Sequence, residues 1–345
     1  MNQLIVPSES KSLLSSSGKV PNVLSDAGGD VVKVFLTFFT DQIRNPNTRQ
    51  AYLHNAVAFF EWCGDNNLSF ADIESFHISG YIEQHRQTKS DATVKQHLAS
   101  IKMLFDWMVI QQIVPRNPAA AVRGPKIVIR KGKTPVFDEA GAKEFFASFE
   151  NRATEEAREM HVVELRDRAF CAVMTYAMPR VSSVCGMLNE DFYLNGTTWW
   201  LRFSHGKGGV HHEMPAHHKL VEYLHAYLDA ASTAGLPDVA GRAKAGEKKG
   251  LLFRSTRGQT RLLTERPLRR QNALDMVKRR AKDAGIQMNI CNHTFRGSGI
   301  TNYMKNGGSL KKARDMAAHA DTRTTMLYDH SGDQATLDEV ERIHI

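Results

Sequence analysis

The stretch CNHTFRGSGITNYMKNGGSLKKARDMAAHADTRTTMLYDH, residues 291–330, gathers side chains of the kinds that handle phosphate groups. His293 and Arg296 are three residues apart, so they share one face if this segment is a helix. His319 and Tyr328 follow, nine residues apart, with the segment ADTRTT between them. A phosphodiester under attack needs planar cationic donors for its oxygens, and a phenol needs a base or a positive field to act as the nucleophile. The stretch therefore predicts a site that attacks a backbone phosphate.

Two residues outside this stretch complete the predicted chemistry. Arg180 follows Pro179, which disfavours helical geometry at Met178 and so ends the apolar helix predicted for LRDRAFCAVMTYAM. Lys207 lies in HGKGG, where the glycines allow a close backbone approach. A lysine at such a turn can reach a departing alkoxide and supply its proton. Arg180 provides the second cationic donor for the phosphate.

Length, charge and cysteine usage limit the possible classes of protein. The chain has 345 residues, 42% of them hydrophobic, which is enough for two packed domains. Its formal net charge of +8 favours a polyanionic partner without identifying one. The four cysteines have no paired spacing, so we expect neither disulfides nor a cysteine metal site. No apolar run approaches the roughly 18 residues of a membrane span, and the N-terminus lacks the pattern of a secretion signal.

The apolar periodicity divides the chain into five parts. Residues 1–29 are Ser-rich and aperiodic, which predicts a flexible tail. Residues 30–117 contain four amphipathic patterns, which predict a small helical domain. Residues 118–135 are rich in proline and basic side chains and predict a linker. Residues 136–330 form the second predicted domain, and residues 331–345 have helical spacing that predicts a tail helix.

The second domain combines helices with a small sheet. Asn195-Gly196 lies between two β-rich runs, which is a strong hairpin signal. GKGG predicts a further turn, with Lys207 in it, so we expect three antiparallel strands. The fold class predicted from these patterns is mainly α, with a small antiparallel β-sheet and two domains.

The order of these motifs resembles that of the tyrosine recombinases of the phage integrase family. The helical first domain is also similar to the core-binding domain of that family, through NTRQAYLHNAVAFFEWC and TVKQHLASIKMLFDWM. The resemblance covers roughly residues 30–330, and several motifs in the family's order are far more specific than one. The motifs YAMPRVSSVCGM, GKGGVHHEMP, HTFR and AAHADTRTTMLYDH contain Arg180, Lys207, His293, Arg296, His319 and Tyr328.

The resemblance implies a two-domain clamp on double-stranded DNA and a homotetramer on paired recombination sites. It implies that Tyr328 attacks the scissile phosphate and leaves a 3′-phosphotyrosine, and that Arg180 and Arg296 bind the phosphate. Lys207 would protonate the leaving oxygen, while two histidines would act as acid/base and as hydrogen-bond donor, namely His293 and His319 in that order. The reaction requires no cofactor and no metal, and accessory proteins are possible partners. A cytoplasmic enzyme of bacterial, phage or mobile-element origin fits this reading.

Five positions depart from the family pattern. Ser183 stands where an acidic residue is usual, and Gly297 stands where a histidine is common. Val210 and His212 replace frequently basic hairpin positions, and Ala318 replaces the usual glycine before His319. None of these changes removes a primary catalytic group, so we expect them to affect the rate or the assembly of the site.

Further basic and polar residues are candidates for contact with DNA. In the helical and linker segments, such side chains lie off the apolar face or in the basic stretch that could follow a phosphate backbone. In RPLRRQNALDMVKRRAKDAG they lie directly before the HTFR motif. The ordinary alternative is a solvated helix face for the helical residues and a solvated connector for the linker residues. The candidates are Thr48, Arg49, Lys95, His97, Lys102, Arg123, Lys131, Arg269 and Arg270.

Three other functions remain open at this point. A type IB-like topoisomerase would use the same chemistry on one duplex, and a catalytically silent protein could keep only the DNA clamp. A metal-dependent nuclease would use the histidines of HHEMPAHH. Adjacent residues of a strand point to opposite faces, so His211 and His212 should not bind one ion together, and we expect no metal site.

Overall fold

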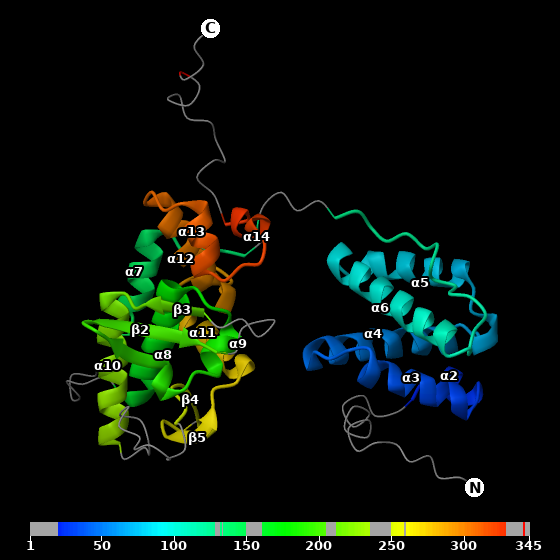
Figure 1. Ribbon diagram of the computed structural model, residues 1–345, viewed down its shortest axis with the longest axis horizontal. Helices are drawn as coiled ribbons and strands as arrows, with labels where there is room; N and C mark the ends of the chain where they lie inside the picture. The colour runs from blue at the N-terminus through cyan, green and yellow to red at the C-terminus, as the bar shows by residue number, and fades with distance from the viewer. Residues whose placement is uncertain are drawn as a thin grey trace. The chain divides into compact units, whose positions relative to one another are not determined.

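The computed structural model shows two compact units, and each is described here by itself. The structure describes residues 20–127, 132, 134–149, 161–204, 212–234, 250–258, 260–328 and 341. The first unit, here the helical unit, comprises Met1–Ile129, and the second, here the mixed unit, comprises Arg130–Ile345. The division falls within the segment for which the sequence predicts a linker. Figure 1 shows the two units and their elements.

The helical unit forms where the sequence provides caps and apolar faces. The side chain of Asn45 accepts hydrogen bonds from the backbone N–H groups of Asn47 and Thr48, and Pro46 occupies the first helical position of α4. The side chain of Ser90 caps α6 in the same way. The elements of this unit are α2 (Asn22–Asp26), α3 (Gly29–Asp41), α4 (Pro46–Asp65), η1 (Phe70–Asp72), α5 (Ser75–Thr88) and α6 (Asp91–Ile110).

Aromatic rings fill the core of the helical unit. Phe59 packs edge-on against Tyr81 and Phe105, with ring centroids 5.2 and 6.3 Å apart. The expected flexible tail of residues 1–29 needs a correction, because α2 lies within it. Leu24 of α2 is fully buried in this core, so burial of apolar side chains orders the chain before residue 30.

The mixed unit contains helices and two small sheets. Its helices are α7 (Glu139–Ala147), α8 (Val162–Ala172), the π-helix η3 (Val173–Ala177), α9 (Val181–Cys185), η4 (Asn189–Asp191), α10 (His218–Thr233), α11 (Arg270–Asp283), α12 (Asn292–Lys305), α13 (Leu310–Met316) and α14 (Thr322–Met326). Its strands are β1 (Phe192–Asn195), β2 (Thr198–Phe203), β3 (His212–Pro215), β4 (Arg254–Thr256) and β5 (Leu263–Pro267).

The predicted antiparallel sheet is present, in the order β1-β2-β3. Asn195 pairs with Thr198 across the hairpin, and Gly196 between them has φ 62°, a conformation that glycine adopts without strain. The predicted turn that contains Lys207 lies outside the described residues. The second sheet, in which β4 pairs with β5, was not predicted.

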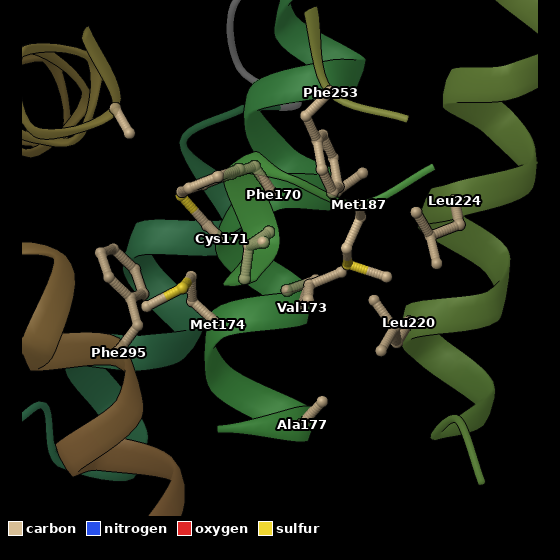
Figure 2. Close-up of a cluster of buried hydrophobic side chains, with 14 of the residues drawn as sticks. Phe170, Cys171, Val173, Met174, Ala177, Met187, Leu220, Leu224, Phe253 and Phe295 are labelled. Carbon is tan, nitrogen blue, oxygen red and sulfur yellow. The ribbon is translucent and has the colours of Figure 1, made fainter. Parts of the chain in front are cut away.

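The core of the mixed unit is built around α8 and η3. Figure 2 shows Phe170, Met174 and Ala177 of this continuous segment among side chains of other elements, including Phe253 and Phe295. Met178, directly after η3, has φ 53° and ψ 34°, so the helical segment ends in a left-handed residue immediately before Pro179. This exit brings the next residue, Arg180, to the start of α9.

The predicted fold class, mainly helical with small antiparallel sheets, is confirmed. No helix among the described residues is long and apolar enough to cross a membrane. The predicted tail helix of residues 331–345 lies outside the described residues except for Glu341, and the clamp arrangement stays a prediction.

Candidate functional site

Arg296 is the buried centre of the site. It lies on α12 and is 2% exposed, although it carries a charge. Its Nη1 donates to the carbonyl of Met178, and its Nη2 donates to the carbonyl of Ala317 at 2.6 Å. Burial, together with the positive charge of Arg180, lowers the pKa of the guanidinium to about 10. The group stays charged at neutral pH, and it is positioned to attract an anion.

Left-handed residues shape the two turns that hold Arg296. One is Met178, and the other is Ala318 with φ 47°. After α13, the N–H of His319 donates to the carbonyl of Arg314 at 3.0 Å, and the N–H of Ala318 donates to that of Asp315 at 2.9 Å. These bonds form the Schellman motif, whose left-handed position favours glycine. The left-handed conformation therefore explains why glycine is usual before His319 in the family. Ala318 takes the same conformation at a cost of about 1–2 kcal/mol.

Arg180 approaches the same turn from the other side. It is the residue before the first turn of α9, and its Nη1 lies 3.4 Å from the carbonyl oxygen of Ala318. The carbonyls of Ala317 and Ala318 thus face the two arginines predicted to bind one phosphate. The turn that carries His319 is the element that brings these arginines together.

The two histidines are held in their neutral forms. His319 is 8% exposed, and its Nδ1 lies 2.9 Å from the hydroxyl of the buried Thr325. Burial and the charges of Arg296 and Arg180 lower the pKa of His319 to about 4. Partial burial and the same two arginines also lower the pKa of His293. The residue as a whole is nevertheless solvent-exposed. Both imidazoles are therefore uncharged at neutral pH.

Tyr328 lies against this cluster from its own chain. Its ring is parallel to that of His319 within 12°, with the centroids 6.2 Å apart. The hydroxyl of Thr301 donates to the carbonyl of Tyr328 at 2.9 Å and anchors its backbone. A Cβ on Gly297 would lie 3.0 Å from the Tyr328 ring, so the ring passes directly over this glycine of α12. The glycine in place of the family's frequent histidine leaves room for the ring.

The structure brings together five of the six predicted catalytic residues, and Lys207 lies outside the described residues. A pocket of about 840 Å³ opens beside them. Its walls also contain Ser183 and His212, two of the positions that depart from the family pattern. The pocket is lined by Arg180, Ser183, His212, Arg296 and His319, among others.

The structure contradicts one predicted DNA-contact residue, His97. This side chain is 6% exposed, and its Nδ1 lies 2.8 Å from the hydroxyl of Tyr81 in the core of the helical unit. Val94 and Ile101 are buried on the same face of α6, three and four residues away. Burial, with smaller contributions from His85 and other neighbours, lowers the pKa of His97 to about 4. His97 is a core histidine rather than a phosphate contact.

The other predicted contacts differ in exposure, and two of them have hydrogen bonds to nearby carbonyls. Thr48, Lys95 and Arg123 are exposed, as are the two arginines at the start of α11. Arg49 donates from Nε and Nη2 to the carbonyl of Ile43, at 3.1 and 3.0 Å. Lys102 donates to the carbonyl of Ala120 at 3.1 Å. Both of these side chains therefore also hold local structure. The residues that stay predictions are Thr48, Arg49, Lys95, Lys102, Arg123, Arg269 and Arg270, and Lys131 lies outside the described residues.

The histidines of HHEMPAHH serve separate local roles. Nδ1 of His217 accepts from the N–H of Lys219 and caps α10, and its ring stacks on Tyr176 at 4.4 Å. His212 stacks on Phe203 within the sheet. Within the described part of the chain, no group of three or more His, Cys, Asp or Glu side chains could hold a metal ion. His211 is outside that part.

Sequence reasoning missed several groups that build the site. Thr325 holds His319, Thr301 holds Tyr328, and the carbonyls of Met178 and Ala317 hold Arg296. Thr325 stands inside the quoted motif, but its residue type alone does not distinguish it from its neighbour Thr324. Backbone carbonyls carry no sequence signal at all.

Comparison with known proteins decides the family. The sequence model of the phage integrase family matches residues 149–335. The model of the phage integrase N-terminal SAM-like domain matches residues 35–112. The chain belongs to the phage integrase family.

Its relatives in this family include recombinases similar over most of their length. The chain is 25% identical to tyrosine recombinase XerD of Ralstonia nicotianae over 284 residues, which is 82% of this chain and 83% of that protein. It is 25% identical to tyrosine recombinase XerC of Thermodesulfovibrio yellowstonii over 316 residues, or 90% of this chain and 96% of that protein.

Solved structures of family members share the fold. The XerH site-specific recombinase bound to palindromic difH substrate, in a post-cleavage complex, matches with a TM-score of 0.65 and 16% identity, over 97% of this chain and 92% of that chain. A lambda integrase dimer bound to a COC′ core site matches with a TM-score of 0.61 and 16% identity, over 94% of this chain and 86% of that chain. These likenesses concern the fold alone.

Proposed function

We propose that Tyr328 cleaves and rejoins DNA strands through a covalent 3′-phosphotyrosine. Site-specific DNA recombination is the activity of the family to which the chain belongs. The observation that carries the assignment is the placement of the Tyr328 ring beside His319 and over α12, which bears the buried and charged Arg296. Two guanidinium groups line one pocket, and a phenol lies beside His319 of the same pocket; these groups are the donor set that phosphoryl transfer needs without a metal.

In the proposed cleavage, the six predicted catalytic side chains account for the bond that forms, the bond that breaks and both proton transfers. The Oη of Tyr328 attacks phosphorus, and the bond from phosphorus to the 5′-oxygen of the next nucleotide breaks. Arg180 and Arg296 hold the phosphoryl oxygens, on which charge grows in the transition state. His293 is neutral at pH 7, because its pKa is lowered, and it can accept the phenolic proton. Lys207 supplies a proton to the leaving 5′-oxygen, and the reverse steps rejoin a strand.

The wider setting of the reaction is part of the same proposal. Two recombination sites and four copies of the chain would allow the 5′-hydroxyl of one strand to attack the phosphotyrosine of another. The exposed basic residues of the helical unit and of α11 would hold the DNA backbone. Cytoplasmic action in a bacterium or on a mobile element, with accessory proteins, fits the recombinase relatives from Ralstonia nicotianae and Thermodesulfovibrio yellowstonii. These relatives favour recombination over the topoisomerase and the silent DNA-binding alternatives.

Trapping of the covalent complex tests the proposal. Duplexes selected from a random pool for binding to the Tyr328→Phe variant would be nicked near each candidate cleavage position and incubated with the wild-type protein in EDTA. We expect a protein–DNA adduct that resists denaturation with the wild type and none with Tyr328→Phe.

Tyr303→Phe is the matched control. It removes a phenolic hydroxyl from α12, the helix against which the Tyr328 ring lies, and it should form the adduct normally. Binding of the selected duplexes without any wild-type adduct would overturn the proposal and favour a silent DNA-binding protein. If the wild type cleaves DNA without forming an adduct, and this cleavage occurs only when EDTA is left out, the result would point to a metal-dependent nuclease.

A further inference from the structure

A short segment that follows the boundary between the two units crosses the tyrosine-bearing part of the mixed unit. We call Gly132 together with residues 134–137 the strap. At its start, the N–H of Gly132 donates to the carbonyl of Leu327 at 3.2 Å, and Leu327 directly precedes Tyr328. At its end, the N–H of Phe137 donates to the hydroxyl of Ser298 on α12 at 2.7 Å, in a buried position. The strap is thus attached both to the segment of the nucleophile and to the helix beneath it.

The first attachment requires glycine for reasons of space. Gly132 does not have a positive φ, so its backbone conformation is open to other residues. A Cβ at this position would nevertheless lie 2.6 Å from the carbonyl oxygen of Leu327, closer than real Cβ contacts come. Because the clashing atom belongs to the backbone, a larger residue must displace either the strap or the segment of Tyr328.

The middle of the strap reaches the ring of the nucleophile through a second glycine. A Cβ on Gly297 would lie 2.9 Å from a methyl carbon of Val136 and 3.0 Å from Cε1 of Tyr328. Val136 and the Tyr328 ring therefore both close on the bare surface of α12 at this glycine. The ring is confined between strap, helix and His319.

Among the described residues, the backbone of Tyr328 is held by few contacts, one of which runs from its N–H to the carbonyl of Thr325 at 2.9 Å. The helix before it, α14, has 5 residues, too few to be stable without tertiary contacts. Two successive carbonyls fix the chain as it leaves α14: that of Leu327 by Gly132, and that of Tyr328 by Thr301. One of these two anchors therefore belongs to the strap.

We propose that the strap positions Tyr328 for attack, with Gly132 and Val136 as positioning residues. This inference rests on the proposed role of Tyr328 as the nucleophile.

The Gly132→Ala variant tests the strap on the nicked duplexes described above. We expect adduct formation to slow by about 10- to 100-fold, because a displacement near 1 Å at the nucleophile is enough for a loss of that size. The affinity for DNA and the melting temperature should stay at the wild-type values. Gly80→Ala is the matched control, since nothing lies within 4 Å of a Cβ at that exposed helical position, and it should react at the wild-type rate.

A leaving group that needs no proton separates positioning of Tyr328 from assistance to the leaving oxygen. When sulfur replaces the 5′-oxygen at the cleaved phosphate, a thiolate departs unaided, so the Lys207→Ala variant should regain activity. The slow reaction of Gly132→Ala should persist on this substrate. Recovery of Gly132→Ala on the sulfur substrate would show that the strap acts on the proton donor and would overturn the proposal.

The remaining outcomes are also decisive. If the wild type forms no adduct, the proposed function fails and the strap is not at issue. If the wild type reacts and Gly132→Ala matches it, the strap proposal alone fails. Should Gly132→Ala fold poorly, Val136→Ala removes a contact without adding a clash, and a slowing in the same direction supports the strap while a wild-type rate refutes it.

Discussion

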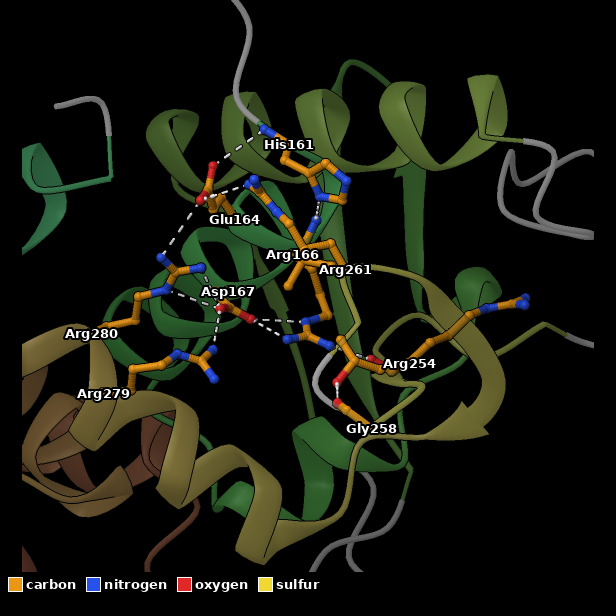
Figure 3. A network of polar contacts seen from close by, with 11 residues as sticks. His161, Glu164, Arg166, Asp167, Arg254, Gly258, Arg261, Arg279 and Arg280 are labelled. Carbon is orange, nitrogen blue, oxygen red and sulfur yellow. Dashed lines mark hydrogen bonds and ion pairs between the residues drawn. The ribbon is translucent and has the colours of Figure 1, made fainter. Parts of the chain in front are cut away.

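Two groups of arginines in the mixed unit differ in what neutralises their charge. In the first group, Asp167 is fully buried on α8 and accepts hydrogen bonds from three arginines (Figure 3). Nε and Nη2 of Arg280 lie 3.0 and 2.8 Å from its Oδ2, and Nη2 of Arg279 lies 3.3 Å away. Nε of Arg166 donates to the other oxygen at 2.9 Å. Here a carboxylate compensates the buried charge.

A second carboxylate extends this network. Oε1 of Glu164 accepts a hydrogen bond from Arg261 at 2.9 Å and lies 4.0 Å from Nη1 of Arg280. Nη1 of Arg166 donates to the backbone carbonyl of Arg254 at 2.7 Å and ties α8 to β4. Arg280 lies in the basic run before the HTFR motif, but it is 4% exposed and serves this network.

The second group, at the candidate site, has no such compensation among the described residues. The hydrogen bonds of Arg296 go to two backbone carbonyls, and no carboxylate within the described residues pairs with it. Arg180 and two neutral histidines surround it. A buried cation without a carboxylate is costly, and it is justified where an anion arrives from outside. The arginines of the first group stabilise the fold, whereas those of the second group are placed to bind an incoming anion.

The largest effect is expected at the compensated group. Asp167→Asn removes the shared charge from three arginines and should lower the free energy of unfolding by about 3–5 kcal/mol, as for other broken buried ion pairs. Differential scanning calorimetry of the full chain measures the change. Glu139→Gln is the control, because the pair of Glu139 with Lys143 is exposed and such pairs contribute little to stability. A similar small loss for both variants would contradict the structural role of Asp167.

A smaller effect of a different kind is expected at the uncompensated group. Sulfate, used as a phosphate mimic at 10 to 100 times its dissociation constant, should raise the free energy of unfolding of the wild type by about 1.4–2.7 kcal/mol. Arg296→Gln should lose this gain, because it removes the buried cation that faces the anion. Calorimetry with and without sulfate, at constant ionic strength, measures the difference.

The control for this measurement is an arginine that already has a carboxylate. Arg202 donates to Glu213 at 2.6 Å, so Arg202→Gln should keep the response to sulfate. Equal loss of the response in both variants would mean that sulfate binds through general surface charge, and the distinction between the two groups of arginines would fail.

The smallest effect concerns the turn that presents carbonyls to the arginines. Ala318→Gly should raise the free energy of unfolding by about 0.5–1 kcal/mol, because glycine takes the left-handed conformation without strain but loses more backbone entropy on folding. Calorimetry should show the opposite sign for Ala140→Gly, in the first turn of α7, where glycine only weakens the helix. Destabilisation by Ala318→Gly would argue against strain at this turn.

Much of the fold follows from local patterns. Apolar spacing predicts the helices, and Asn195-Gly196 predicts the hairpin, because both signals act between residues close in the chain. The pattern failed at His97, which lies beside an apolar face and was placed outside it. Its burial depends on Tyr81 of another helix, which local spacing does not contain. The sheet of β4 and β5 was missed for a different reason, which is that its two strands have only a weak local signal.

The sequence by itself determined which residues are predicted to form the catalytic set, because residue types in a fixed order carry the chemistry. It also determined the helical and hairpin segments that bear them. Only the tertiary structure decided that Arg296 is bound by carbonyls while Arg280 is bound by a carboxylate, although both are arginines on helices. Only the tertiary structure placed Gly132 against Leu327, which lie far apart in the chain. The physical reason is that side-chain chemistry is local, whereas burial and the direction of a carbonyl depend on segments that meet only when the chain packs.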